Sequence, residues 1–385
     1  MEERSDMSGR SIKCNVTQDG RLFIVDPGLD CLGLIKKLWP DFRLQAVPPP
    51  PGFMPSFQRT RRIFIPEIAP DKLPILDTAR LWELHEKALN EGFENLFSNN
   101  GVSLLDLKIE LARREIRRCA LCGWQCGVNR FKEKGRCGLG PDAYYDEPFV
   151  HVAEEAVITP CAMIRLAGCA LTCVFCQARE GYATQPLRRL DSGIWNKLSS
   201  DKYFSRAAAL EFGGGNPDES ACAILEALAA APGPLRLPVV MNDNGYASPV
   251  LYGLLDGVVD VWLADFKYGN DACGRKLSGV GNYVEVAEEG LRQMCGQKAK
   301  TIVRMLVLPG HVECCHEKTL EKLAVFRGKI WLSIIDGYVP DWKARNHPDL
   351  NRLVSEGEIV RVRESARSHG LRDVSEAGEG FWGSD

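Results

Sequence analysis

Six short apolar runs alternate with amphipathic stretches of helical period in the part of the chain after residue 160. This alternation constrains the fold most, because strands joined by helices form a parallel sheet with right-handed crossovers. The predicted strands cover residues 162–166, 208–212, 237–241, 259–265, 301–308 and 330–335. The predicted helices between them include residues 219–231, 249–255, 284–295 and 317–326. The pattern predicts an α/β fold, an open and partial TIM-like (β/α)6 barrel with its chemistry at the carboxyl ends of the strands.

The chain before this pattern has a different texture. We expect residues 1–118 to form an N-terminal accessory region, 119–150 a Cys-rich metal-binding segment and 151–385 the core barrel. The elements predicted in the accessory region are a strand at 21–25, a proline-rich linker at 47–52 and helices at 76–90 and 104–118, the second with Arg/Lys-rich faces.

Composition narrows the function. The 385 residues carry a net charge of −3, which gives no sign of a nucleic-acid surface. No apolar run is long enough to cross a bilayer, and residues 1–11 lack the apolar stretch of a signal peptide. We therefore expect a cytoplasmic protein that binds neither membrane nor nucleic acid. Fifteen cysteines in such a chain are not expected to form disulfides, and seven of them fall in two tight groups that indicate metal.

The first group follows the first predicted strand with the spacing C-x3-C-x2-C, as Cys169, Cys173 and Cys176. Three thiolates on one loop can bind three irons of a [4Fe–4S] cubane and leave the fourth iron without a protein ligand. An open coordination position is what a catalytic metal centre needs. Structural zinc is a weaker interpretation, because it takes four closed ligands. Cysteines that merely pack as small hydrophobic residues do not account for the cluster.

This spacing, with the aromatic Phe175 just before the third cysteine, resembles the signature of the radical S-adenosylmethionine (SAM) superfamily. The resemblance implies an oxidoreductase-type enzyme in which the amino and carboxylate groups of SAM chelate the open iron. One electron from the cluster then cleaves the sulfonium C–S bond, and the 5′-deoxyadenosyl radical takes a hydrogen atom from the substrate. A one-electron donor such as flavodoxin or ferredoxin is also implied.

From Cys119 to about Asp373 the chain is similar to proteins described as pyruvate formate-lyase-activating enzymes. The matching segments, in the family's order, are residues 119–122, 126–130, 169–177, 242–246, 255–260, 264–268, 306–309 and 336–338. The resemblance implies a glycyl-radical-enzyme activase as one alternative, with the backbone of a partner protein as substrate. The other alternative is a small molecule or another protein side chain.

The resemblance also implies a SAM pocket at the strand ends. Its expected residues are Phe175, Gly213, Gly214, Gly215, Asn216, Asn242, Asp243, Asn244, Asp265, Lys267 and Arg304. Asp265 and Lys267 lie two residues apart, so they face the same side of a strand. Two positions depart from the family pattern. The glycine segment lacks the glutamate of a Gly-Gly-Glu-like motif, and Met305 stands where many relatives carry histidine.

The second group reads C-x2-C-x3-C-x10-C, as Cys119, Cys122, Cys126 and Cys137. Four thiolates form a closed site, which suits structural zinc and an auxiliary [4Fe–4S] cluster equally on ligand count. A further cluster of sulfur and imidazole groups follows the fifth predicted strand and consists of His311, Cys314, Cys315 and His316. It is either a surface loop or the source of a thiol that contacts substrate.

Two other classes of function compete with the enzyme. One is an iron–sulfur electron-transfer or redox-sensing protein without SAM catalysis. The other is a zinc-binding interaction module, which predicts zinc and no iron. Polar residues at four predicted strand ends favour the enzyme over the electron-transfer protein.

Overall fold

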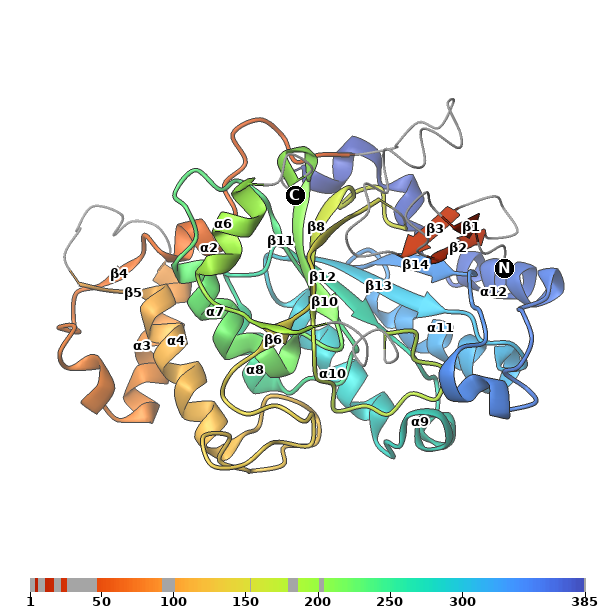
Figure 1. The fold of residues 1–385 in the computed structure, drawn as a ribbon, viewed down its shortest axis with the longest axis horizontal. Helices are drawn as coiled ribbons and strands as arrows, with labels where there is room; N and C mark the ends of the chain where they lie inside the picture. The colour runs from red at the N-terminus through yellow and green to blue at the C-terminus, as the bar shows by residue number, and fades with distance from the viewer. Residues whose placement is uncertain are drawn as a thin grey trace.

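The computed structural model describes residues 47–91, 101–152, 154–178, 186–200 and 204–383, and three short strands nearer the N-terminus. Its centre is a nine-stranded sheet (Figure 1). The parallel strands are β8 (Cys161–Leu166), β10 (Ala209–Gly214), β11 (Val239–Asp243), β12 (Val261–Asp265), β13 (Lys300–Leu306) and β14 (Trp331–Ile335). They pair in chain order, each parallel to the next. The predicted α/β fold with a mostly parallel sheet is confirmed, and the sheet is open, with β14 at one edge.

Helices connect these strands and flank the sheet. They are α6 (Gly193–Ser200), α7 (Ala221–Ala229), α8 (Pro249–Leu255), α9 (Asp271–Ser278), α10 (Tyr283–Cys295), α11 (Glu317–Leu323) and α12 (Glu356–Ser368). Short antiparallel strands extend the β8 side of the sheet: β6 (Tyr144–Tyr145), β7 (Phe149–His151) and β9 (Arg188–Arg189). The single-turn helices are Leu73–Ile75, Ile116–Arg118, Phe204–Arg206, Asp218–Ser220, Val312–His316, Ala324–Phe326, Trp342–Asn346, Val374–Glu376 and Gly378–Trp382.

In the described residues of the N-terminal part there are small strands and three α-helices. These elements are β1 (Arg4–Ser5), β2 (Ser11–Val16), β3 (Leu22–Val25), α2 (Ser56–Thr60), β4 (Phe64–Ile65), α3 (Thr78–Glu91), β5 (Val102–Ser103) and α4 (Leu104–Glu115). The strand predicted at 21–25 and the helices predicted at 76–90 and 104–118 are present to within three residues. Residues 47–52 form neither helix nor strand, as a proline-rich linker should.

Predicted and observed element ends differ where tertiary contacts intervene. The fifth strand was expected to run to residue 308, but β13 ends at Leu306. Beyond it, the Leu308 amide donates to His316 Nε2 at 2.9 Å instead of continuing the ladder. The helix expected at 317–326 tightens into a 3-10 turn after Leu323.

Side-chain alternation along the strands gives the sheet two different faces. Residues such as Ile164, Phe212 and Met241 pack under the helices in the main core. Their neighbours on the opposite face, such as Val240 and Leu263, form a smaller core. Because side chains alternate, the next positions along that second face are Asn242 and Asp265, at the carboxyl ends of the strands. One face therefore changes from apolar to polar along its strands.

The C-terminal segment covers the apolar end of this second face. Val374, Ala377 and Phe381 belong to the smaller core. Trp382 Nε1 donates to the carbonyl oxygens of Val47, at 2.7 Å, and Val157, at 3.0 Å. The segment that begins at Val47 and the C-terminal segment thus meet at the amino end of β8, and the carboxyl ends of the strands remain accessible.

Helix α4 joins the N-terminal part to the sheet layer. Figure 1 shows α3 and α4 beside α7 and α8, and α4 contacts both of the latter. A capping box starts α4, since Ser103 Oγ accepts from the Asp106 amide and Asp106 accepts from the Ser103 amide. Leu104, Leu107 and Leu111 are fully buried in the main core. Residues of the predicted accessory region therefore share a core with the sheet and its helices.

One basic residue of α4 does not face solvent, in contrast to the Arg/Lys-rich faces expected there. Lys108 is fully buried, with its Nζ 2.6 Å from His85 Nε2 and 3.5 Å from the Gly253 carbonyl oxygen. Burial lowers the pKa of Lys108 to about 7, and burial followed by the charge of Lys108 lowers the pKa of His85 to about 2. Neutral His85 accepts at Nε2, while its Nδ1 lies 3.2 Å from Glu86 Oε1.

This pair predicts a specific pH dependence of stability. The folded-state pKa of Lys108 lies below its unfolded value, so its protonation opposes folding fully below pH 7, and this cost disappears as pH rises toward 10.5. We expect the free energy of unfolding of Lys108→Met to exceed that of the wild type by an amount that shrinks by up to about 1.4 kcal/mol per pH unit from pH 7 to 10. Denaturant unfolding at several pH values measures the difference. A difference that does not change with pH contradicts the prediction.

Within the described residues, no helix combines the length and the apolar character needed to cross a bilayer.

Candidate functional site

A cavity of about 550 Å³ opens at the carboxyl ends of the parallel strands. The three cysteines of the loop after β8 line it, together with residues from the ends of β10, β11, β12 and β13. The predicted pocket residues in its wall are Phe175, Gly214, Gly215, Asn216, Asn242, Asp243, Asn244, Asp265, Lys267 and Arg304. Gly213 is not part of the wall, but a Cβ there would lie 3.2 Å from that of Asn242.

The cysteine loop is held from two sides. Its Thr172 and Val174 amides donate to the carbonyl oxygens of Ser278 and Leu277, at 3.2 and 2.8 Å, at the end of α9. The Cys169 amide donates to the Cys137 carbonyl oxygen at 3.2 Å. Gly168, just before the first cysteine, has a φ of 89°, which favours glycine. The position of all three sulfurs therefore depends on α9 and on the Cys-rich segment.

Hydrogen-bond donors and charge surround the sulfur atoms. Ser278 Oγ donates to Cys173 Sγ at 2.8 Å, and the Leu171 amide donates to Cys169 Sγ at 3.4 Å. Burial raises the pKa of the Cys169 and Cys173 thiols, while the charge of Lys267 acts in the opposite direction at Cys173. Without a bound cation these thiols stay protonated, so they are poorly suited to act as free nucleophiles.

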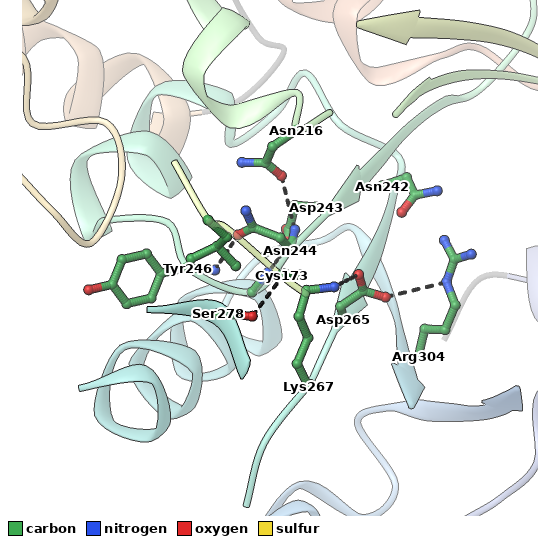
Figure 2. A network of polar contacts seen from close by, with 12 residues as sticks. Cys173, Asn216, Asn242, Asp243, Asn244, Tyr246, Asp265, Lys267, Ser278 and Arg304 are labelled. Carbon is green, nitrogen blue, oxygen red and sulfur yellow. Dashed lines mark hydrogen bonds and ion pairs between the residues drawn. The ribbon is translucent and has the colours of Figure 1, made fainter. Parts of the chain in front are cut away.

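The glycine turn after β10 depends on close backbone approach. A Cβ at Gly215 would overlap the carbonyl oxygen of Gly168 and lie 2.9 Å from that of Leu166. Asn216 follows, and its Oδ1 accepts from the Asn244 amide at 3.0 Å, which links the ends of β10 and β11 (Figure 2). The Gly-rich turn thus brings the backbone of β10 against the cysteine loop.

Asn242, Asp243 and Asn244 end β11 with side chains in different roles. Asn242 Nδ2 donates to Glu211 Oε1 at 2.7 Å, and Asn244 Oδ1 accepts from the Tyr246 amide at 2.9 Å. Asp243 Oδ1 accepts from the Gly245 amide at 2.6 Å, but its Oδ2 is buried without a hydrogen-bond partner. Burial raises the pKa of Asp243 to about 7. This carboxylate is able to accept one further hydrogen bond.

A charged network closes the other side of the cavity. Lys267 Nζ and Asp265 Oδ2 form an ion pair, although β12 ends at Asp265 and Lys267 follows it in a non-strand segment. Arg304 Nη1 donates to Glu154 Oε2 at 2.6 Å, and Arg304 Nε lies 3.6 Å from Asp265 Oδ1 (Figure 2). Arg304 Nε and Nη2 are buried without a hydrogen-bond partner. Carboxylates thus balance the charge of the inward-facing Arg304, and its Nε and Nη2 atoms can each donate a further hydrogen bond.

Sequence reasoning did not single out two residues that the fold brings to this site, and it assigned a third, Cys137, only to the second metal group. Glu154 lines the cavity and pairs with Arg304, from which it is 150 residues distant. Glu219 Oε1 accepts from the Ala170 amide at 3.0 Å, and its Oε2 accepts from Asn216 Nδ2 at 2.6 Å. Cys137 contributes to the cavity wall. Glu219 lies four residues after Gly215 of the Gly-rich segment, and this short distance was the one sequence signal that could have marked it as a site residue.

The second cysteine group lies beside the first. The Cys169 amide of the first group donates to the Cys137 carbonyl oxygen of the second at 3.2 Å. Burial raises the pKa of the Cys119, Cys122 and Cys137 thiols, that of Cys137 to about 11.

The glycines beside these cysteines divide between two tasks. Gly127 and Gly138 have φ values of 68° and 83°, as expected for loops that turn around a metal. Gly123 instead lies against the Tyr246 ring, which a Cβ would approach to 2.7 Å. The Gly123 amide donates to the Tyr246 carbonyl oxygen at 2.8 Å, so the Cys-rich segment is attached to the end of β11.

Neither cysteine group converges on a single ion. Among the described residues, the groups whose ligand atoms all lie within 4.8 Å of one another are Cys273–His311–Cys314 and His151–Cys161–Glu211. Sulfur ligands of one tetrahedral zinc lie roughly 3.8 Å apart. The sulfurs of the two predicted groups are spread more widely.

The 311–316 segment is mostly buried, unlike a surface loop. His316 and Cys315 are fully buried, His311 is nearly so, and Cys314 is exposed. As far as the described chain goes, none of the four lines the cavity at the strand ends.

Fold and site together define a mixed α/β protein with a cysteine-lined polar cavity at the carboxyl ends of its parallel strands. The chain belongs to the same family as the uncharacterized protein MJ0674 of Methanocaldococcus jannaschii. The two are 33% identical over 307 residues, which cover 77% of this chain and 89% of the archaeal protein. No protein-family model matches the chain.

Proposed function

We propose that this protein is a radical SAM enzyme. The observation that carries the proposal is one cavity whose wall contains Cys169, Cys173 and Cys176 and polar residues from four consecutive strand ends. The finer fold proposal follows: the open sheet is the partial, TIM-like (β/α)6 barrel of such enzymes, with its site at the expected end.

The cysteine loop fits a [4Fe–4S] cluster better than a single ion. It offers three thiols and no fourth cysteine within the loop, and their sulfur atoms are not drawn together. The amide and hydroxyl donors at Cys169 and Cys173 suit sulfur atoms that carry negative charge. Cys169, Cys173 and Cys176 would hold the cluster and leave one iron open toward the cavity.

The remaining wall fits a zwitterionic nucleoside ligand such as SAM. The unpartnered Arg304 nitrogen atoms and Asp243 Oδ2 provide buried donors and an acceptor for it. The backbone of Gly214 and Gly215 and the side chain of Asn216 would orient its amino acid part, in place of the absent glutamate. When bound, the cluster supplies the electron that cleaves the sulfonium C–S bond of SAM and so releases a 5′-deoxyadenosyl radical for hydrogen-atom abstraction.

Residues of this chain would exclude water from the reacting groups and offset the negative charge of the thiolates. Leu306, Leu308 and Ile335 give the cavity an apolar section beside the charged one. The Lys267–Asp265 pair places a cation near Cys173, where it offsets thiolate charge. A protein or small-molecule substrate, a flavodoxin or ferredoxin donor and a cytoplasmic location belong to this proposal, with glycyl-radical activation as one form of it.

We further propose that Cys119, Cys122, Cys126 and Cys137 hold a second metal centre. Their wide spread favours an auxiliary [4Fe–4S] cluster over zinc. Cys137 lines the cavity, so this centre would lie next to the first.

Anaerobic reconstitution tests the proposed function. Purified protein is supplied with iron, sulfide, dithionite and SAM, and 5′-deoxyadenosine is measured over time. We expect its formation to depend on both iron and reductant. A reducible cluster that leaves SAM intact would indicate an electron carrier, and a protein with zinc and no iron would indicate an interaction module. Either result contradicts the proposal.

The Ser278 hydroxyl should tune the cluster. It donates to Cys173 Sγ, and such a bond stabilises the reduced, more negative state. We expect Ser278→Ala to lower the midpoint reduction potential by an amount on the order of tens of millivolts, measured by redox titration of the reconstituted protein. Ser200→Ala, at an exposed serine at the end of α6, is the control and should change nothing. An unchanged or raised potential in Ser278→Ala contradicts the prediction.

A further inference from the structure

We propose that Cys273, His311 and Cys314 form a zinc site that is separate from both cysteine groups described above. Cys273 lies in the first turn of α9, and the other two residues come from the segment after β13. The sequence shows no motif that connects them, because Cys273 precedes His311 by 38 residues. The proposal does not depend on the proposed SAM chemistry.

The distances between the three ligand atoms match one tetrahedral ion. Cys273 Sγ lies 3.9 Å from Cys314 Sγ and 3.7 Å from His311 Nδ1. Cys314 Sγ lies 3.4 Å from His311 Nδ1. Zinc bound at about 2.3 Å to sulfur and about 2.0 Å to nitrogen separates two sulfurs by roughly 3.8 Å and a sulfur from a nitrogen by roughly 3.6 Å. All three separations fall within about 0.2 Å of these values.

The surroundings of His311 support a metal ligand. Its Nδ1 faces the two sulfurs, and its Nε2 is buried without a hydrogen-bond partner, 3.7 Å from Asp349 Oδ2. A carboxylate beside the second ring nitrogen is the common arrangement of a metal-bound histidine, because it fixes the tautomer. Asp349 is itself held by Lys276 Nζ at 2.8 Å, also from α9.

Cys315 is not placed as a fourth ligand, because its sulfur accepts from the Gly269 amide at 3.1 Å and donates to the Lys267 carbonyl oxygen at 3.9 Å. Two thiolates and an imidazole select zinc over magnesium or calcium, which take oxygen ligands. Because Cys314 is exposed, a water molecule would occupy the fourth position, so the site would be open rather than closed by four protein ligands.

The site would fix one end of the helix that holds the cysteine loop. Asn270 caps α9 by accepting from the Cys273 amide at 2.9 Å, and its side-chain amide donates to the Cys314 carbonyl oxygen. The other end of α9 presents Ser278 to Cys173 and to the loop backbone. A zinc ion at Cys273 would therefore anchor α9 to the 311–316 segment.

Metal analysis of the full-length chain tests the site. Zinc and iron per chain are measured in anaerobically purified wild type, Cys273→Ser, Cys314→Ser and the control Cys295→Ser on α10. We expect each of the first two variants to lose about one zinc relative to wild type, with iron unchanged, and the control to lose none. Protein prepared with Co²⁺ should show thiolate-to-cobalt absorption that is lost in the same two variants.

Each alternative outcome is decisive. Because Cys314 is exposed, Cys314→Ser tests the site even if Cys273→Ser does not fold. A folded Cys314→Ser protein with wild-type zinc overturns the proposal, as does wild type without zinc in which mass spectrometry finds a Cys273–Cys314 disulfide. Failure of the proposed SAM chemistry is a separate result, since it appears as missing iron or missing 5′-deoxyadenosine with the zinc content unaffected.

Discussion

Replacing Cys173 with alanine should reduce 5′-deoxyadenosine formation to background. Cys173 contributes one of the three thiols at the cavity, and its sulfur accepts the Ser278 hydrogen bond. A cubane with two of three protein ligands on its loop loses its anchor, so iron content should fall by about four per chain. The second cysteine group does not include Cys173, so a metal bound there should remain. Iron analysis and a SAM cleavage assay measure the two effects.

The matched control for this experiment is Cys295→Ala. Cys295 ends α10 and is not part of the cavity wall, so iron content and SAM cleavage should match the wild type. If Cys173→Ala forms 5′-deoxyadenosine at the parental rate, the cluster is not at this loop. If the control fails as well, the defect lies in protein quality, and the comparison must be repeated on protein shown to be folded.

Replacing Gly245 with alanine should destabilise the protein more than the same substitution at any other glycine of the site. Gly245 has a φ of 71°, and a Cβ there would overlap the Asp265 carbonyl oxygen and lie 2.8 Å from Tyr283 Oη. The left-handed backbone alone costs an L-residue roughly 1–2 kcal/mol. The overlap is with backbone, which cannot swing aside. We expect a total loss of about 3 kcal/mol or more in the free energy of unfolding.

Thermal unfolding measures this loss, with an expected fall in midpoint of about 4 °C or more for a chain of 385 residues. The control is Gly233→Ala, because Gly233 is exposed and nothing lies within 4 Å of its added Cβ. That variant should stay within about 0.5 kcal/mol of wild type. Because Tyr283 Oη accepts from the Lys267 amide and donates to the Asn244 carbonyl oxygen, Gly245→Ala should also weaken SAM binding. A Gly245→Ala protein as stable as the control contradicts the prediction.

Local pattern determined much of the fold and of the site. Strand and helix periods located β8, β10 to β14 and their helices to within a few residues. Asp265 and Lys267 were predicted to face one side of a strand; they do form an ion pair, but β12 ends at Asp265, so strand alternation does not explain the contact. The three-cysteine loop lies at a strand end with the predicted polar residues around it, because carboxyl ends of parallel strands share one edge of a sheet.

The positions of charged residues on the 104–118 helix predicted burial less well than the spacing of its apolar residues. The 104–118 helix was predicted to carry Arg/Lys-rich faces, and one of its basic residues, Lys108, is fully buried against His85. The spacing of apolar residues predicts one buried face of α4. It does not reveal that α3, through His85, and α8, through Gly253, also cover the side of α4 that carries Lys108.

The sequence by itself determined which segments become strands and helices, and which cysteines stand close enough along the chain to share a metal. Tertiary structure alone decided the pairing of Glu154 with Arg304 and the meeting of Cys273 with His311 and Cys314. The physical reason is the separation along the chain over which each kind of interaction acts. Hydrogen-bonding periods and ligand spacings act over a few residues and leave a local pattern. A contact between residues 38 or 150 positions apart depends on how the strands and helices pack, and no short stretch of sequence encodes it.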